Sequence, residues 1–231
     1  MIEVERVMEG IFPNRAEAGR RLAESLSAYR GRDDAIVLGL PRGGVPVAYE
    51  VARQLGLPLD VFVVRKLGVP GYEELAMGAI ASGNVSVLNQ DVLRALPNPE
   101  AILETVMAQE KIELELREAR YRQDQPAPVL GGRVVILVDD GLATGATMRA
   151  AAAALRKQGV ARIVVAVPVG APETCRELDS EVDEMICPIM PAFFHGVGQF
   201  YEDFSQTTDE EVQELLAKAK EGERQRMKDE G

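Results

Sequence analysis

Residues 134–147 read VVILVDDGLATGAT, and the order of residue types along them indicates the fold class of the chain. It opens with an apolar run, passes through two adjacent carboxylates and a loop of small residues, and enters an alanine-rich segment, 147–158, followed by Gly159. A continuous run of β-branched residues is typical of a strand buried on both faces, as in parallel sheets. The stretch therefore predicts a buried strand, a tight loop and a helix with a glycine at its end.

Three other apolar runs have the same character, and helical patterns lie around them. The runs are 35–39, 61–64 and 163–167, and residues 14–29 place alanine and leucine among charges, as a surface helix does. Strands that alternate with helices in this way build βαβ units. We therefore expect an α/β fold with a doubly wound, mainly parallel sheet.

Residues 76–122 interrupt this alternation. The segment 76–88 predicts two short strands around Ser82-Gly83-Asn84, which together form a hairpin. Asn98 and Pro99 then open a long charged helix that reaches about Arg122. The charges along this helix indicate a surface that faces solvent or a dimer partner.

We expect a single domain over residues 1–231. Its parts are a core at about 14–183, an insertion at about 72–125 that holds the hairpin and the long helix, and a C-terminal subdomain with its helix at about 185–231. The last helix begins at about Thr208, three residues before Glu211, which is the spacing of a capping box. We interpret it as a solvated helix that frays near Gly231.

Composition narrows the possible partners and the compartment. The 231 residues carry 26 basic and 37 acidic side chains, and the net charge of −11 disfavours non-specific binding to nucleic acid or to an anionic membrane. Two cysteines and one histidine exclude a disulfide framework and a histidine-based metal cluster, and they favour a reduced, cytoplasmic setting. Residues 1–6 lack an apolar core, so we expect no secretion signal. Prolines and glycines interrupt the uncharged stretch 185–201, so we expect no membrane helix.

The loop after the carboxylates has the composition of a phosphate-binding site. Small residues let the backbone N–H groups of 143–147 converge, and the following helix adds unpaired donors and the positive end of its dipole. The hydroxyls of Thr144 and Thr147 add two donors. Asp139 and Asp140 lie beside this cradle, where carboxylates accept hydrogen bonds from sugar hydroxyls or hold a Mg²⁺ water. A plain helix cap is the structural alternative, but it does not explain two adjacent carboxylates, which repel each other.

This pattern resembles the signature for phosphoribosyl pyrophosphate (PRPP) of the type I phosphoribosyltransferases, in which an acidic pair follows a strand and precedes a threonine-glycine loop. The resemblance implies the fold of that family, PRPP as co-substrate and a Mg²⁺ ion. It implies that Asp139 and Asp140 hold the ribose hydroxyls, hold the metal through them or through water, and take part in catalysis. The residues implied for the 5′-phosphate and ribose are Gly141, Ala143, Thr144, Gly145, Ala146 and Thr147. The Asp-Asp-x-Leu-Ala-Thr-Gly form is nearest to adenine-type members. The whole chain resembles a group of stand-alone bacterial proteins that are described only as members of this family.

Two further stretches extend the resemblance. LGLPRGGV, residues 38–45, stands where the family has its pyrophosphate loop, with a cis peptide that here falls at Pro41–Arg42. RKLGVPG, residues 65–71, is similar to the beginning of the mobile catalytic loop. From the residues alone, the paired glycines also fit a simple helix start, and the lysine also fits a solvated side chain. The implied pyrophosphate ligands are Arg42, Gly43, Gly44, Arg65 and Lys66, of which Lys66 is also implied in catalysis.

The sequence departs from the family at the groups that move protons. Hypoxanthine–guanine members have an Asp three residues after the acidic pair, where this chain has Ala143. Adenine-type members have a Glu in the mobile-loop hairpin, but residues 80–84 hold no acid here, and Glu73 or Glu74 is the nearest candidate. The general acid or base therefore stays open. Rate enhancement by positioning and by pyrophosphate stabilisation is one alternative, and weak or lost activity is the other.

The resemblance places the acceptor base under a C-terminal hood, residues 191–201. The implied base contacts are Phe194, Val197, Phe200 and Tyr201, because this Val-Gly-x-aromatic run resembles the hood of purine-type members. Aromatic residues form only 5% of the chain and gather here, which favours a stacking surface. A role in filling the core of the subdomain is equally open. His195 is better interpreted as a hydrogen-bonding surface residue than as a catalyst.

The first functional hypothesis is a transferase that moves the 5-phosphoribosyl group from PRPP to a small nitrogen base and releases pyrophosphate. The second is a non-catalytic sensor of PRPP or of a nucleotide on the same fold. The third is a phosphoribosyl hydrolase or phosphorylase. The resemblance also implies a homodimer, and it leaves the identity of the base open.

Overall fold

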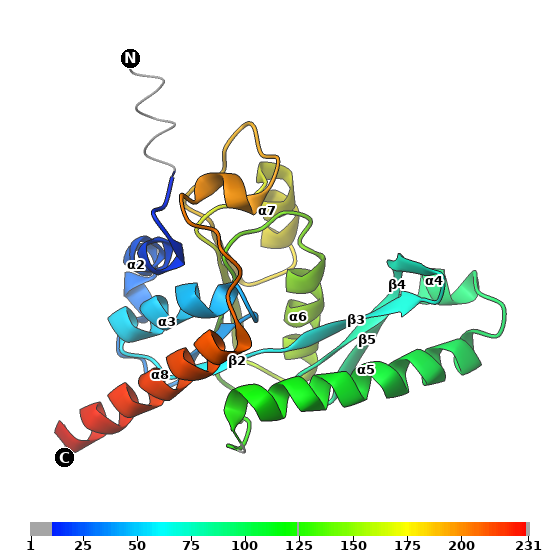
Figure 1. Cartoon of the computed structure of the whole chain (residues 1–231), viewed down its shortest axis with the longest axis horizontal. Helices are drawn as coiled ribbons and strands as arrows, with labels where there is room; N and C mark the ends of the chain where they lie inside the picture. Colours follow the sequence, from blue (N-terminus) through cyan, green and yellow to red (C-terminus); the bar gives the residue numbers. More distant parts are fainter. Residues whose placement is uncertain (1–10, 124, 230–231) are drawn as a thin grey trace.

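The computed structural model describes residues 11–123 and 125–229, so the expectations for residues 1–6 and for fraying near Gly231 lie outside the described part. Figure 1 shows a main body from which an arm extends to one side. The helices are α2 (Arg15–Ser25), α3 (Gly44–Leu55), α4 (Gln90–Arg94), α5 (Pro99–Arg122), α6 (Ala146–Lys157), α7 (Pro172–Asp179) and α8 (Asp209–Asp229), with single 3-10 turns η1 (Ser27–Tyr29) and η2 (Val197–Phe200). The strands are β1 (Ala35–Gly39), β2 (Leu59–Val61), β3 (Val64–Val69), β4 (Tyr72–Ala81), β5 (Val85–Leu88), β6 (Val134–Val138), β7 (Arg162–Ala166) and β8 (Glu184–Ile186).

The main sheet consists of parallel strands in the order β2-β1-β6-β7-β8. β1 and β6 are buried along their whole length and β7 along most of it, as their continuous apolar runs predict. α2, α3 and α8 pack on one face of the sheet, and α6 and α7 pack on the other (Figure 1). The doubly wound α/β fold is therefore confirmed.

The expectation of one strand over residues 61–64 is wrong. β2 ends before Phe62, and β3 begins after Val63. The Phe62 N–H donates to the Gly39 carbonyl at 3.0 Å, and the Val63 N–H donates to the Ser82 hydroxyl at 2.9 Å. The chain leaves the main sheet at this point and enters the arm, so its apolar run continues across the junction of two sheets.

The arm is a second, antiparallel sheet with the order β3-β4-β5. The predicted hairpin is confirmed: β4 and β5 are joined by a turn at Gly83, although β4 is longer than expected. α5 runs along the arm (Figure 1), where Leu114 is buried and Val106 is partly buried against the core. Arg65 of β3 and Glu110 of α5 form an ion pair at 2.7 Å. One side of α5 is therefore packed against the arm, while Lys111, Glu115 and Arg120 on the helix are exposed, as the charges of the segment predict.

α8 packs across α3 and α5. The Glu211 N–H donates to the Thr208 hydroxyl at 3.1 Å, so the predicted capping by Thr208 is confirmed. Val212 and Leu216 are buried. The interpretation of α8 as a solvated helix is therefore wrong for the side that carries Val212 and Leu216. The many charged residues of the segment concealed these apolar positions.

The hood follows β8, which joins the main sheet beside β7. Single β-bridges tie Ile189 to Val169 and Tyr201 to Phe12, so both ends of the hood are fastened to the body. Among the described helices, none combines the length and the apolarity that a membrane crossing requires.

Candidate active site

The candidate site lies between β1 and β6, where the strand order of the main sheet reverses. Gly39 and Val138 are paired at the ends of these strands, and the Leu40 N–H donates to the Val138 carbonyl at 2.9 Å. The loops 40–43 and 139–145 therefore leave the sheet side by side. In sheets of this kind, the crevice at such a switch point is the usual place for a ligand.

The glycines of the first loop allow it to approach the acidic pair. A Cβ at Gly43 would lie 2.1 Å from Asp140 Oδ2, and a Cβ at Gly44 would lie 2.9 Å from Asp139 Oδ1. Real Cβ atoms essentially never show contacts under 3.0 Å. Both positions therefore need glycine because of this close approach, and the two loops form one site.

Asp139 and Asp140 lie side by side at the end of β6, and both are half-buried. Burial raises the pKa of Asp139 well above its usual value, and the charge of Asp140 raises it further. Burial also raises the pKa of Asp140, but the Arg15 guanidinium opposes this shift. Arg15 Nε donates to Asp140 Oδ2 at 2.8 Å. A protein cation thus relieves part of the repulsion that two adjacent carboxylates create.

Arg15 is the site residue that the sequence pattern does not reveal. It lies in the first turn of α2, and 125 positions separate it from Asp140. Its Nη1 donates to the Ser205 carbonyl at 2.7 Å, and its guanidinium stacks on the Phe204 ring, 4.0 Å from the centroid. The available signal was an arginine at the start of a predicted helix, which is too common a feature to indicate this role.

Tyr201 holds the backbone of the acidic pair. Its hydroxyl donates to the Asp140 carbonyl at 2.6 Å, and its ring packs against Phe12 and Phe204. The side chain is only 6% exposed, and burial raises the pKa of its hydroxyl, so the hydroxyl remains a donor. The structure thus gives Tyr201 a contact that positions the acidic pair, and the base contact that the resemblance implies stays a prediction.

The loop 139–145, which we call the phosphate loop after its sequence pattern, ends at the start of α6, and no side chain caps that start. Gly145 has φ +74° and directly precedes α6. Among the described residues, none accepts a hydrogen bond from the N–H groups of Ala146 and Thr147, and both residues are exposed, as are Ala143 and Thr144. Free N–H groups at the positive end of a helix dipole make a site for an anion.

Two side chains fix the phosphate loop through its carbonyl groups. The Thr174 hydroxyl donates to the Ala143 carbonyl at 2.7 Å, and Arg149 Nη1 donates to the Thr144 carbonyl at 2.9 Å. Arg149 is itself held by Glu181 at 3.0 Å. Because these contacts use the carbonyl oxygens, the loop is rigid while its N–H groups stay available to a ligand.

The hood leans on the same loop. The side chain of Val197 lies 2.5 Å from where a Cβ of Gly141 would be, so this position also needs glycine. Phe194 and Phe200 stack with their centroids 5.7 Å apart and an interplanar angle of 17°, and both are half-buried. Phe193 is 83% exposed. The stacked pair therefore forms part of the hood's own core and still keeps surface open for a ligand.

The expected pyrophosphate cations do not gather at one point. Arg42 follows a cis peptide bond, as the resemblance implies, and its Nη1 lies 3.9 Å from Asp209 Oδ1. The guanidinium of Arg65 is engaged with Glu110. Lys66, the next residue on β3, is exposed and lines a pocket beside α6. Neighbouring residues on a strand face opposite sides, so Arg65 and Lys66 are directed apart, which differs from the expectation of a common cluster.

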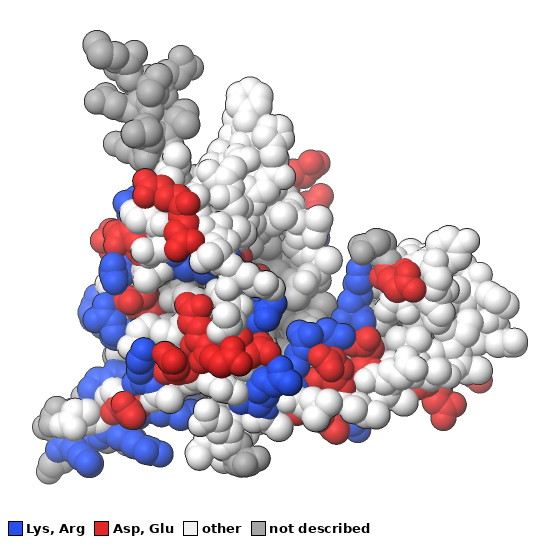
Figure 2. Space-filling model, in the orientation of Figure 1, with Lys and Arg blue, Asp and Glu red and all other residues white. Residues whose placement is uncertain are grey.

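Charge on the face drawn in Figure 2 is mixed. Lys and Arg side chains alternate with Asp and Glu over α8 and over the beginning of the arm, and the top of the molecule, where the hood lies, is uncharged in this view. This face therefore carries small local groups of charge and no continuous basic surface.

The residues considered as general acid or base either make other hydrogen bonds or lie exposed on the surface. Glu73 is exposed and accepts from the Gly71 N–H at 3.2 Å within its own turn, and the side chain of Glu74 lies outside the described part. His195 is exposed on the hood. Among the described residues, no three His, Cys, Asp or Glu side chains cluster as a metal site would require.

Known proteins resemble this chain over most of its length. The family model for the phosphoribosyl transferase domain matches residues 11–205. The curated relative "Putative phosphoribosyl transferase Rv0571c" from Mycobacterium tuberculosis is 46% identical over 209 residues, which are 90% of this chain and 47% of that protein. The chain thus spans about half the length of the curated relatives it matches first. "Bifunctional protein PyrR" from Streptomyces coelicolor is 29% identical over 163 residues, 70% of this chain and 65% of that protein.

A solved structure has the same fold. The protein TT1426 from Thermus thermophilus superposes with a TM-score of 0.80 and 44% sequence identity, over 90% of this chain and 98% of that one. The family match spans both loops, the acidic pair and the hood. This chain therefore belongs to the phosphoribosyl transferase domain family, with the fold of the type I phosphoribosyltransferases.

Proposed function

We propose that the chain binds PRPP together with Mg²⁺, transfers its 5-phosphoribosyl group to a nitrogen base and releases pyrophosphate. The observation that carries this proposal is the close approach of Asp139 and Asp140 to the paired glycines of loop 40–44, beside the open start of α6. One site thus combines acceptors for sugar hydroxyls with donors for phosphate, and a phosphorylated ribose needs both.

In this proposal the 5′-phosphate lies at the N-terminus of α6. It accepts from the N–H groups of Ala146 and Thr147 and from the hydroxyls of Thr144 and Thr147. The carboxylates of Asp139 and Asp140 accept from the ribose hydroxyls. Arg15 favours the ionised form of Asp140 in its half-buried place, and Tyr201 fixes the backbone from which that carboxylate extends.

The acidic pair fits a Mg²⁺ ion that arrives with the substrate. Mg²⁺ prefers oxygen ligands, keeps several waters and is commonly held by one or two carboxylates together with phosphate oxygens. Asp139 and Asp140 offer carboxylates in a cradle that a Cβ at Gly43 or Gly44 would fill. When bound there, the ion supplies positive charge that stabilises the departing pyrophosphate.

The proposed transfer breaks the bond between C1 of the ribose and pyrophosphate, and it forms a bond from C1 to nitrogen. The base gives up its N–H proton, for which the pyrophosphate oxygens are available acceptors. Positive charge develops at C1 as pyrophosphate departs, and an ionised carboxylate beside the ribose stabilises that charge. Arg42 and Lys66 are the cations that we assign to the leaving group.

A sensor that binds PRPP without turning it over is the second candidate. It is favoured by the engagement elsewhere of one expected pyrophosphate ligand and one candidate for proton transfer: Arg65 pairs with Glu110, and Glu73 accepts from Gly71 within its own turn. Both functions use the same PRPP site, so binding alone does not separate them.

Release of pyrophosphate from PRPP and Mg²⁺, measured over a panel of nucleobases and small amines, tests the proposal. Release that depends on one acceptor supports the transferase and identifies that acceptor. Release without any acceptor indicates hydrolysis, and tight PRPP binding without release indicates the sensor. Absence of PRPP binding contradicts the role given to residues 139–147.

A further inference from the structure

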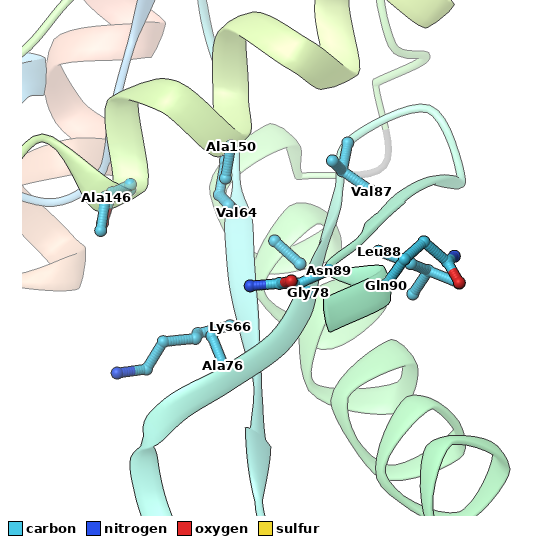
Figure 3. A pocket seen from close by; sticks show the side chains of 12 residues that line it. Val64, Lys66, Ala76, Gly78, Val87, Leu88, Asn89, Gln90, Ala146 and Ala150 are labelled. Atoms are coloured by element: carbon cyan, nitrogen blue, oxygen red, sulfur yellow. The ribbon is translucent and has the colours of Figure 1, made fainter. Parts of the chain in front are cut away.

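A cavity of about 470 Å³ lies between the arm and the first turns of α6 (Figure 3). Three of its lining residues also serve the function proposed above: Lys66 is assigned to the pyrophosphate, and Ala146 and Thr147 begin the helix that is assigned to the 5′-phosphate. Its volume is in the range of small-molecule sites, about 300–1,000 Å³. The cavity therefore has room for a ring-sized ligand.

The walls of this cavity are mainly apolar. Val64, Val87 and Leu88 line it from the arm, and Ala150 lines it from α6 (Figure 3). All four are half-buried, so part of their apolar surface meets water. A ligand that covers such surface gains roughly 25 cal/mol for each Å² removed from water. An apolar body is therefore favoured in the middle of the cavity.

Lys66 is the one charged residue among the described residues that line the cavity. None of its described lining residues is acidic, although the chain as a whole carries 37 acidic and 26 basic side chains. In Figure 3, Lys66 extends from β3 toward the side of the cavity where Ala146 begins α6. The positive end of the α6 dipole adds to the field of the lysine. This end of the cavity therefore favours an anion.

A neutral polar group lies between the apolar walls. The Asn89 amide points into the cavity from the start of α4 (Figure 3). Its oxygen accepts from the Asp91 and Val92 N–H groups at 3.2 and 3.3 Å, so the amide nitrogen is the atom that suits an acceptor on the body of a ring. A few convergent polar groups in an apolar pocket are the usual source of orientation in small-molecule sites.

We infer that this cavity binds an anionic small molecule with an apolar, ring-sized body. The body lies between Ala150 and the side chains of Val87 and Leu88, and the anionic group faces Lys66 and the start of α6. The body of this ligand is separate from the place of the acceptor under the hood, whereas Lys66 and the start of α6 belong both to this site and to the proposed PRPP site. Binding of this ligand does not require that the chain transfers a phosphoribosyl group.

The fluorescent probe 8-anilino-1-naphthalenesulfonate belongs to this ligand class, and N-phenyl-1-naphthylamine has the same rings without the anion. We expect the full chain to bind one sulfonate probe, with an affinity roughly tenfold higher than for the neutral probe. Ala150→Leu fills the cavity, and Ala153→Leu is the matched control, because Ala153 is half-buried on the same helix but does not line the cavity. We expect Ala150→Leu to weaken probe binding at least about tenfold and Ala153→Leu to leave it unchanged. Equal binding by both variants overturns the inference.

Two further measurements keep the inference testable. If Ala150→Leu does not fold, Ala76→Val on β4 fills the same cavity from the opposite wall. Lys66→Met is expected to remove most of the preference for the sulfonate probe over the neutral one, and an unchanged preference overturns the anionic part. A PRPP titration of Ala150→Leu separates the two proposals. If Ala150→Leu binds both PRPP and the sulfonate probe as wild type does, the proposed ligand site in the cavity is wrong and the proposed function is unaffected. If wild type binds the sulfonate probe but not PRPP, the proposed function is wrong and the ligand site is unaffected.

Discussion

Arg15 Nε lies 2.8 Å from Asp140 Oδ2, although 125 positions separate the two residues in the chain. Through this contact the first described helix reaches the acidic pair at the end of β6. The same guanidinium donates to the Ser205 carbonyl, so one side chain joins α2, the acidic pair and the segment after the hood. The guanidinium favours the ionised form of Asp140, because it opposes the rise in pKa that burial causes.

Replacing Arg15 by Met is expected to destabilise the fold by about 1–3 kcal/mol near pH 7, because Asp140 loses a charged donor. Arg15 lowers the pKa of Asp140, so its removal raises that pKa further. The ion pair contributes only while Asp140 is ionised, so the difference from wild type shrinks as pH falls and the carboxyl is protonated. Urea unfolding near pH 7 and near pH 4 measures it.

Arg21→Met is the control for this effect. Arg21 lies on the same helix and is about half exposed, and its ion pair with Glu17 is long, at 3.5 Å. Because exposed ion pairs contribute little, its loss is expected to change the unfolding free energy by less than about 0.5 kcal/mol. A loss for Arg15→Met that is equal at both pH values contradicts the pairing with an ionised Asp140.

Asp139→Asn is expected to stabilise the fold near pH 7 and to weaken PRPP binding. Burial raises the pKa of Asp139 in the folded chain, so the folded state favours the protonated form, and the stability this contributes is lost as pH rises above the ordinary Asp value of 3.8. An amide avoids that loss, and a gain of about 0.5–2 kcal/mol is typical of such relief. Melting temperatures of both proteins near pH 7 and near pH 3.5 check this, because the gain disappears at the lower pH. A variant that is less stable than wild type near pH 7 contradicts the raised pKa.

Tyr201→Phe removes the donor to the Asp140 carbonyl and leaves that buried acceptor unpaired. We expect the unfolding free energy to fall by about 1–3 kcal/mol. We also expect weaker PRPP binding, because the Asp140 backbone loses the hydrogen bond that positions the acidic pair. Tyr72→Phe is the matched control, because Tyr72 is 73% exposed on the arm. Thermal unfolding and PRPP titration of both variants measure the two effects. Unchanged PRPP affinity in Tyr201→Phe argues against its positioning role.

Gly44→Ala is expected to disrupt the site, because the new Cβ would lie 2.7 Å from the Val138 carbonyl oxygen and 2.8 Å from Asp139 Cα. Both are backbone atoms of a buried strand end and cannot turn aside, so a loss above about 2 kcal/mol is expected. Gly131→Ala is the control, since its Cβ would approach other atoms no closer than 3.6 Å. Comparison of the two melting temperatures decides the point, and similar values contradict the close approach of the two loops.

Three strands of the main sheet, β1, β6 and β7, and the loop after β6 were predictable from local sequence, whereas β8 was not predicted. Buried parallel strands need continuous apolar runs, and 35–39 and 134–138 have them without interruption. The run 61–64 misled for the same reason, because apolarity marks burial and does not tell in which sheet a residue lies. The buried sides of α5 and α8 were concealed by their high content of charged residues.

The contacts that complete the site were not predictable. Arg15 and Tyr201 reach Asp140 from distant parts of the chain, and only the folded topology brings them together. Arg65 and Lys66 are adjacent in the sequence, but the strand on which they lie turns them to opposite sides. Motif spacing therefore located the loop of the site and did not locate its supports.

Calorimetric titration of PRPP with Mg²⁺ into wild type, Asp140→Asn and Asp183→Asn shows whether the acidic pair binds the ribose of PRPP. Asp183 is the control carboxylate. It comes directly before β8, the edge strand of the main sheet, and its carboxylate pairs with Arg156 at 2.7 Å. We expect wild type and Asp183→Asn to bind one PRPP with equal affinity. Asp140→Asn is expected to bind it about 10- to 100-fold more weakly, the loss typical of a hydrogen bond to a charged group. Equal affinity in all three proteins would contradict the assignment of the acidic pair to the ribose of PRPP.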